Sequence, residues 1–175
     1  MTLPSILLQR GFVPLAIYPG SFDPLTKGHL DLINRGSRLF GRIIVAVLVN
    51  ADKAPLFSVD ERLEMVRHAT GNIANVEVDS FSGLLVHYAA RKGANVLLRG
   101  LRTISDYEIE REMDAINRRL RPEIETVCLM ATEPYLHVSS RRVKEIAALG
   151  GDVSSFIPDF ISERLRAKLQ GKDLI

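Results

Sequence analysis

With 175 residues, the chain falls within the usual length of a single domain, and its 46% hydrophobic and 25% charged residues are typical of a soluble globular protein. Its 23 basic and 21 acidic side chains leave a net charge of +2, which is too balanced for nucleic acid or an anionic membrane to be the main partner. The single cysteine, Cys128, excludes an intramolecular disulfide and a cysteine-based zinc site.

The sequence predicts neither a targeting segment nor a membrane span. Residues 1–12 contain a short apolar stretch, but no basic region precedes it and no long apolar region follows, so it does not match a signal peptide. No run approaches the ~18 apolar residues of a membrane-spanning helix. We therefore expect a cytoplasmic protein that interacts with neither membrane nor nucleic acid.

Short β-branched apolar runs alternate along the chain with longer segments of helical period. In chain order, this pattern predicts strand 13–18, helix 28–40, strand 43–49, helix 59–70, strand 76–78, helix 84–92, strand 96–99, helix 105–120, strand 126–131, helix 139–149 and helix 159–169. Ser58 and Glu61 predict a capping box, and Gly93 predicts a left-handed helix end. Helix 105–120 is highly charged, which by itself is typical of a solvated helix face.

The alternation predicts an α/β fold, a doubly wound, five-stranded parallel sheet with right-handed crossovers. Strand 43–49 and the segment around Cys128 are nearly continuous apolar runs, as in strands covered on both faces, so Cys128 is predicted to lie in the core. No linker or repeat divides the chain. We expect a single domain over residues 1–175, with its core at about 13–169.

The loop after the first predicted strand carries the most informative chemistry. It contains Gly20 and Ser21, and it leads into a helix whose first turn holds Gly28 and His29. The glycines allow a ligand to approach the backbone, and the free N–H groups and dipole of a helix start favour a phosphate, within reach of His29. The pattern is neither a P-loop nor a dinucleotide fingerprint. Taken alone, it also fits a plain strand-to-helix turn with a surface histidine.

Two later segments place basic or hydroxyl groups near strand ends. Arg99 and Arg102 flank the end of the fourth predicted strand, and guanidinium groups grip phosphate oxygens in a bidentate way. Ser139 and Ser140 cap a predicted helix, which makes a second phosphate-binding helix start with Arg141 close behind. Because ligands of doubly wound sheets bind beyond the carboxyl ends of the strands, these groups predict one anion-binding cleft.

These motifs resemble a known enzyme superfamily. Pro-Gly-Ser-Phe-Asp-Pro at 19–24, followed by Thr-Lys-Gly-His at 26–29, is similar to the signature of the nucleotidyltransferases that carry a His/Thr-x-Gly-His motif. Thr26, in place of the histidine usual in the cytidylyltransferase and nicotinamide mononucleotide adenylyltransferase branches, resembles the phosphopantetheine adenylyltransferase branch. The similarity extends in order from Ala16 to about Leu169. Ile116, Val138, Arg142 and the less usual His137 are the departures from the pattern.

The resemblance implies a Rossmann-like nucleotidyltransferase fold and a specific reaction. The adenylyl group of ATP would pass to 4'-phosphopantetheine, giving dephospho-coenzyme A and pyrophosphate in a late step of coenzyme A biosynthesis. Mg²⁺ is expected on the ATP phosphates, and no protein ligands are predicted for it. The resemblance also implies a homo-oligomer, specifically a hexamer, and feedback binding of coenzyme A.

The resemblance also assigns roles to residues. Those implied in catalysis are His29, Lys53 and Arg102. Those implied in phosphopantetheine binding are Ser21, Lys53, Leu85 and Arg99. Those implied in ATP binding are Ser21, Phe22, His29, Gly100, Leu101, Arg102, Glu110, Tyr135, Leu136, His137, Val138, Ser139, Ser140 and Arg141. Taken without the resemblance, Lys53 also fits a solvated loop lysine, and Leu85 fits core packing equally well.

Two alternatives stay open. One is another nucleotidyltransferase of the same superfamily, which would use CTP or a nicotinamide mononucleotide acceptor; Thr26 and the segment 139–141 argue against it. The other is a non-catalytic nucleotide-binding module on the same fold. That alternative predicts loss of the histidine and the basic residues, yet His29, Lys53, Arg99 and Arg102 are all present.

Overall fold

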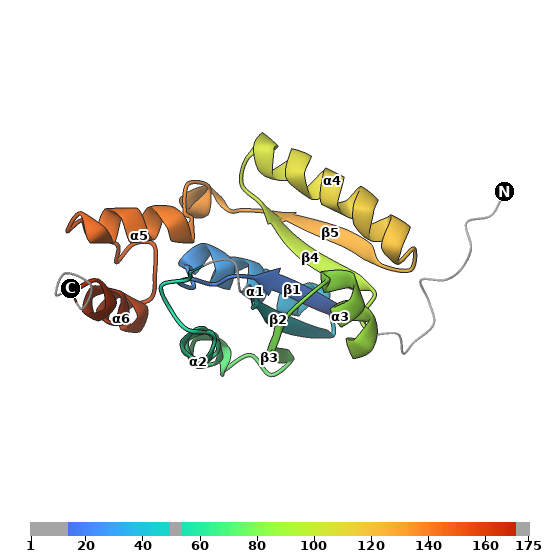
Figure 1. Cartoon of the computed structure of the whole chain (residues 1–175), viewed down its shortest axis with the longest axis horizontal. Helices are drawn as coiled ribbons and strands as arrows, with labels where there is room; N and C mark the ends of the chain where they lie inside the picture. The colour runs from blue at the N-terminus through green and yellow to red at the C-terminus, as the bar shows by residue number, and fades with distance from the viewer. Residues whose placement is uncertain (1–13, 50–53, 171–175) are drawn as a thin grey trace.

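In the computed structural model, which describes residues 14–49 and 54–170, five parallel strands form one sheet in the order β3-β2-β1-β4-β5 (Figure 1). The strands are β1 Leu15–Gly20, β2 Arg42–Leu48, β3 Val76–Phe81, β4 Val96–Leu101 and β5 Glu125–Met130. The helices are α1 Lys27–Leu39, α2 Val59–Thr70, α3 Leu85–Lys92, α4 Ile104–Leu120, the short 3-10 helix η2 Glu133–Tyr135, α5 Ser140–Ala148 and α6 Asp159–Gln170. The predicted doubly wound α/β fold is confirmed.

The alternation of side chains along the strands divides the core between the two faces of the sheet. Ala16 and Val45 face a cluster with α1, α2, α5 and α6, whereas Ile17 and Ile44 face a second cluster with α3. Arg99 lies two residues after Leu97, which belongs to the second cluster, and pairs with α4. Helix α4 therefore covers the α3 face of the sheet, beside β4 and β5 (Figure 1).

Local sequence signals account for the helix ends. The hydroxyl of Ser58 accepts from the N–H of Glu61, and the carboxylate of Glu61 accepts from the N–H of Ser58, so the predicted capping box is confirmed. Gly93 ends α3 at φ 69°, the left-handed conformation that favours glycine, also as predicted. Helix α1 begins one residue earlier than predicted, with Thr26 as its cap.

Several expectations need revision. β1 begins at Leu15, and Val13 of the predicted strand lies outside the described residues. β3 runs three residues beyond the predicted Val78, to Phe81. Cys128 is exposed, so the prediction of a core cysteine is wrong. The reason is the place of β5: it is an edge strand, covered less than the central strands.

Among the described helices, none combines the length and the apolar composition needed to cross a bilayer.

Candidate active site

The predicted site residues gather at the carboxyl ends of β1 and β4. These two neighbouring strands run parallel, and the chain leaves them in opposite directions, toward β2 and toward β5. Such a switch point leaves a crevice at the strand ends, where doubly wound folds bind ligands. The described candidates on the loop after β1, the end of β4, and the starts of α1 and α5 all lie at this edge of the sheet.

His29 is held in one orientation by the start of its own helix. Its Nδ1 accepts the backbone N–H of Thr26 at 3.0 Å, while the Thr26 hydroxyl accepts the N–H of His29, which completes a capping box. Because Nδ1 accepts, the neutral ring carries its proton on Nε2. Burial, and next the positive charge of Arg102, lower the pKa of His29 to about 4. The ring is therefore neutral near pH 7 and presents Nε2–H as a donor.

The start of α1 is less open to a phosphate than the sequence suggests. The N–H of Lys27 donates to the carbonyl of Phe156 at 2.8 Å, and the N–H of His29 is occupied by the Thr26 hydroxyl. Fewer N–H groups are free than expected, because the carbonyl of Phe156 and the two bonds of the capping box occupy those of Lys27, Thr26 and His29. At Gly28 it is Tyr135 that approaches closely, since a Cβ there would lie 3.3 Å from Tyr135 Cβ; approach of a ligand at Gly28 stays a prediction.

Phe22 lies beneath His29 rather than in the crevice. Its ring is buried and contacts the rings of His29 and Tyr18, with centroids 5.1 and 5.6 Å apart. A Cβ on Gly20 would meet this ring at 2.8 Å, so glycine is required there. Phe22 itself has φ 49°, in the left-handed region. Only its backbone is available for the predicted ATP contact, whereas its neighbour Ser21 is exposed.

Arg99 and Glu110 form a bidentate pair across the crevice. Arg99 Nε donates to Glu110 Oε2 at 2.7 Å, and Nη2 donates to the other carboxylate oxygen. The sequence assigned Arg99 to phosphopantetheine and Glu110 to ATP, and the structure brings the two together. An incoming phosphate would have to share or replace the carboxylate to reach Arg99.

Arg102 connects the end of β4 to the segment before α5. Its guanidinium donates to the Asp106 carboxylate and to the carbonyl of Val138 at 3.0 Å. It is also the charge that acts on His29, so these two predicted groups are close in space. Its neighbours Gly100 and Leu101 belong to β4, and Leu101 is buried, so any ligand contact there is through the backbone.

The start of α5 meets the loop after β1. Ser139 caps α5 by accepting the N–H of Arg142, and Ser140 Oγ donates to the carbonyl of Pro24 at 2.8 Å. Arg141 points away: its side chain is 88% exposed and pairs with Glu145 on its own helix. The structure thus brings the two serines to the crevice but not the Arg141 side chain. In the preceding segment, Val138 is buried, His137 is exposed, and Tyr135 and Leu136 are half-buried.

Of the predicted site residues that the structure describes, Leu85 lies apart from this group. Lys53 falls outside the described residues. Leu85 opens α3 after β3 and packs partly buried against the α3 core, as the packing alternative predicts. The roles given to all of these site residues stay predictions.

Sequence reasoning missed the polar side chains that hold the crevice together. Asp23 is buried and accepts from the N–H groups of Leu56 and Phe57 at 3.0 and 2.9 Å, and from Lys144 Nζ. Burial raises the pKa of Asp23, but the hydrogen bonds from Lys144 and the two amides outweigh it and hold the pKa below its usual value. The only sequence signal for this role of Asp23 was its place in a loop between a phenylalanine and a proline.

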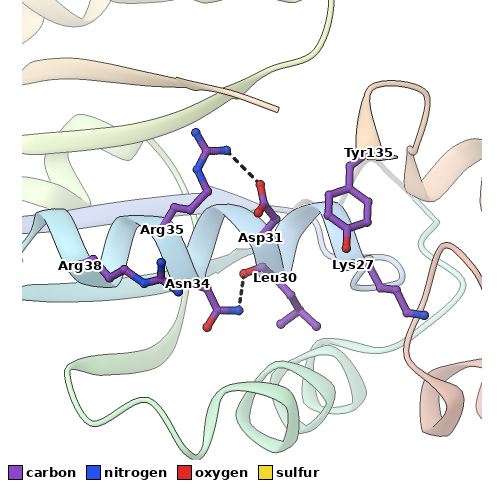
Figure 2. Close-up of a pocket in the computed structure, with 7 residues that line it drawn as sticks. All are labelled: Lys27, Leu30, Asp31, Asn34, Arg35, Arg38 and Tyr135. Carbon is purple, nitrogen blue, oxygen red and sulfur yellow. Dashed lines mark hydrogen bonds and ion pairs between the residues drawn. The ribbon is translucent and has the colours of Figure 1, made fainter. Parts of the chain in front are cut away.

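One described hollow lies along the outer face of α1. It has a volume of about 660 Å³ and is lined by the outer face of α1 together with Tyr135 (Figure 2). Three basic side chains line it, but Arg35 is paired with Asp31, and Lys27 donates to the carbonyl of Ser154. His29 is not among the lining residues, so this hollow is distinct from the crevice.

Comparison with known proteins gives independent evidence on the family of this chain. The model of the cytidylyltransferase-like family matches residues 17–146. The phosphopantetheine adenylyltransferase of Caldanaerobacter subterraneus is 51% identical over 156 residues, which cover 89% of this chain and 98% of that protein. That of Nostoc punctiforme is 56% identical over 148 residues, covering 85% of this chain and 81% of that protein.

Solved structures share the fold at low sequence identity. A putative nicotinate-nucleotide adenylyltransferase from Vibrio parahaemolyticus has a TM-score of 0.64 at 15% identity, covering 90% of this chain and 95% of that one. The nicotinic acid mononucleotide adenylyltransferase of Plasmodium falciparum has a TM-score of 0.60 at 13% identity, covering 93% and 97%. Together with the close relatives, the fold and the motif order show that this chain belongs to the phosphopantetheine adenylyltransferases, within the cytidylyltransferase-like family of nucleotidyltransferases.

Proposed function

We propose that the protein transfers the adenylyl group of ATP to 4'-phosphopantetheine, releasing pyrophosphate and forming dephospho-coenzyme A. The main support is that relatives about 50% identical over most of the chain are phosphopantetheine adenylyltransferases. The geometry agrees, because His29, Arg99, Arg102, Ser139 and Ser140 lie around one crevice at the switch point of the sheet. Basic and donor groups that converge in this way suit a reaction between two phosphorylated substrates.

The chemistry requires no nucleophilic side chain. A phosphate oxygen of phosphopantetheine attacks the α-phosphorus of ATP, and the bond to the β-phosphate oxygen breaks, so pyrophosphate leaves. Catalysis of such transfers is mainly positioning and charge stabilisation. In this proposal, Nε2–H of His29 donates to an α-phosphate oxygen as negative charge builds there. A neutral, partly buried imidazole suits that role, because it donates without having to lose a proton.

The remaining roles follow the side chains around His29. Ser21, Lys53 and Arg99 would bind the acceptor phosphate, with Leu85 along the pantetheine arm. Arg102, Glu110, Ser139 and Ser140 would hold ATP, with backbone contacts from 135–138. Because Glu110 already engages Arg99, binding of the acceptor phosphate is proposed to loosen that pair.

Mg²⁺ is proposed to arrive on the ATP phosphates. Magnesium prefers six oxygen ligands and often keeps waters and substrate phosphates among them. In residues 14–49 and 54–170, no three His, Cys, Asp or Glu side chains gather in a metal-binding group. Phosphate oxygens and water are therefore assigned most of its coordination sphere, where it would neutralise charge on the leaving pyrophosphate.

A pyrophosphate-release assay tests the function directly. We expect pyrophosphate only when ATP and 4'-phosphopantetheine are both present, and a product with the mass of dephospho-coenzyme A. CTP with phosphopantetheine, and ATP with nicotinamide mononucleotide, serve as matched substrate controls. Turnover of either control pair at the same rate would favour another branch of the superfamily, and binding without turnover would favour a non-catalytic module.

We further propose that the protein is a homo-oligomer, a hexamer by family resemblance, and that α4 lies in an interface. The side of α4 toward the protein body is polar and comprises Asp106, Glu110, Asp114 and Asn117. Its exposed side carries an apolar stripe over three turns, between exposed charged residues: Ile109 59%, Met113 44%, Ile116 51% and Leu120 44% exposed. An apolar stripe of this length in water is typical of a protein contact.

Replacing Ile116 with glutamate is expected to shift the protein toward a monomer of 19.5 kDa, because a charge would be buried in the contact. Light scattering after size-exclusion chromatography measures the mass. Leu149→Glu is the matched control, since Leu149 is 89% exposed at the end of α5, away from α4. A monomeric wild type, or an Ile116→Glu variant that keeps its assembly, would contradict the assignment.

The family resemblance also supports two smaller proposals. We place the reaction in the cytoplasm. We also expect coenzyme A to compete with the substrates, because it carries the same pantetheine arm and adenylyl group as the product.

A further inference from the structure

Arg62 is a buried guanidinium whose bonds go to backbone carbonyls. It lies in α2, one residue beyond the capping box, and its exposed fraction is 3%. Its Nη1 donates to the carbonyls of Ser21 at 2.8 Å and Leu48 at 3.1 Å, and its Nε donates to that of Ser58 at 3.3 Å. The three acceptors belong to the loop after β1, the end of β2 and the start of α2.

A buried charge of this kind costs free energy that an apolar side chain of similar size would not. What the guanidinium provides is a fixed arrangement of the backbone, because its donors lie in one plane and hold three carbonyls at set positions. The burial lowers the pKa of Arg62, and the charge of nearby Asp23 raises it in part. Methionine or leucine would be enough for core packing alone. The arginine therefore indicates that the three backbone carbonyls must be held in fixed positions.

One of the segments joined by Arg62 carries a described candidate for the acceptor phosphate. Ser21, whose carbonyl Arg62 holds, exposes its side chain at the crevice. One buried side chain therefore fixes the backbone of Ser21 relative to the end of β2 and the start of α2.

We propose that Arg62 is a positioning residue for the acceptor: it fixes the Ser21 loop against the end of β2 and the start of α2, so that the phosphate of 4'-phosphopantetheine is held for attack, while Arg62 itself touches no substrate. The inference rests on the proposed function, since the acceptor is named there. Arg62 makes no bond to the proposed ATP contacts on α5 and at the end of β4, so its loss is expected to raise the KM for phosphopantetheine more than the KM for ATP.

The fold is expected to survive loss of Arg62, because Asp23 joins the same two segments independently. Its carboxylate accepts the N–H groups of Leu56 and Phe57 and pairs with Lys144 of α5. Removing Arg62 should therefore loosen the loop without releasing it.

The test compares Arg62→Met, which keeps length and apolar bulk, with Arg62→Lys and with Arg67→Met on the exposed side of the same helix. In Arg62→Met, the KM for phosphopantetheine is expected to rise about 10-fold, equivalent to about 1.4 kcal/mol. The KM for ATP should stay within about 2-fold, a change below ~0.5 kcal/mol. Arg62→Lys should recover part of the loss, since its ammonium reaches fewer of the carbonyls at once, and Arg67→Met should match the wild type.

A second measurement separates positioning from stability. Guanidinium ion at millimolar concentration is expected to lower the raised KM of Arg62→Ala by occupying the vacated space, without changing Arg67→Ala. Equal increases in both KM values, or a lower melting temperature with unchanged KM values, would overturn the inference while leaving the function intact. A wild type that forms no dephospho-coenzyme A would instead overturn the proposed function itself.

Discussion

Replacing His29 with alanine is expected to lower turnover on the order of 100-fold or more, the loss typical when one donor to a developing charge is removed. The Nε2–H of His29 is oriented by the bond from Thr26 to Nδ1 and by the rings of Phe22 and Tyr18. A donor held in this way needs no reorganisation as charge builds on the α-phosphate. Since that charge appears in the transition state, ATP binding should change little. Initial rates of pyrophosphate release and calorimetric titration with ATP measure the two effects.

His29→Gln is the matched control for this prediction. Glutamine at the third helical position completes a capping box with threonine, so this variant keeps the start of α1 but lacks the imidazole. Low turnover in both variants would assign the loss to the imidazole rather than to the helix end. Normal turnover in His29→Ala would show that the role given to His29 is wrong.

The lowered pKa of His29 gives this prediction a pH dependence. Because its pKa is about 4 in the folded protein and 6.5 in the unfolded chain, His29 of the free enzyme is neutral at working pH, and kcat/KM should show no acidic limb near pH 6.5 from this group. The folded state also binds fewer protons than the unfolded chain. The contribution of His29 to the free energy of unfolding should therefore fall as the pH drops from about 6.5 toward 4. A kcat/KM profile that titrates near pH 6.5 in the wild type but not in His29→Gln would contradict the neutral donor.

Replacing Asp23 with alanine is expected to lower the free energy of unfolding by about 3 kcal/mol, the scale for breaking a buried, hydrogen-bonded ion pair. The change leaves Lys144 without its carboxylate and removes the acceptor of two backbone N–H groups. It also separates three segments at once, because Asp23 joins the loop after β1 to the residues before α2 and to α5. Urea unfolding followed by circular dichroism measures the loss.

Glu77→Ala provides the control for Asp23→Ala. Glu77 pairs with Arg42 at the surface, where both side chains are more than half exposed, so its removal should cost less than ~1 kcal/mol. The pKa of the Asp23 carboxyl is lower in the folded protein than in the unfolded chain. Its contribution to the free energy of unfolding is therefore complete at pH values above the unfolded pKa, and it is lost as the pH falls through the folded pKa. Equal losses in the two variants would contradict a central role for Asp23.

The helix α4 shows where periodicity and charge pattern stop being informative. The sequence suggested a solvated helix because charged residues are frequent along it. In the fold, Glu110 turns inward to Arg99, and Asp106 turns inward to Arg102, while the apolar residues stay outside. The pattern had the right period, but which face meets the sheet depends on charges supplied by β4, a separate segment of the chain.

The sequence by itself determined the features that depend on neighbouring residues: the order of strands and helices, the capping box of Ser58, the left-handed end at Gly93, and the family signature around His29. These arise from local hydrogen bonds and from hydrophobic periodicity. Only the tertiary structure decided that Cys128 is exposed at the sheet edge and that Asp23 and Arg62 bind the loops around the crevice. The physical reason is that the burial of a side chain and its hydrogen-bond partners depend on residues distant in the sequence. No local sequence pattern shows which of those residues will come into contact.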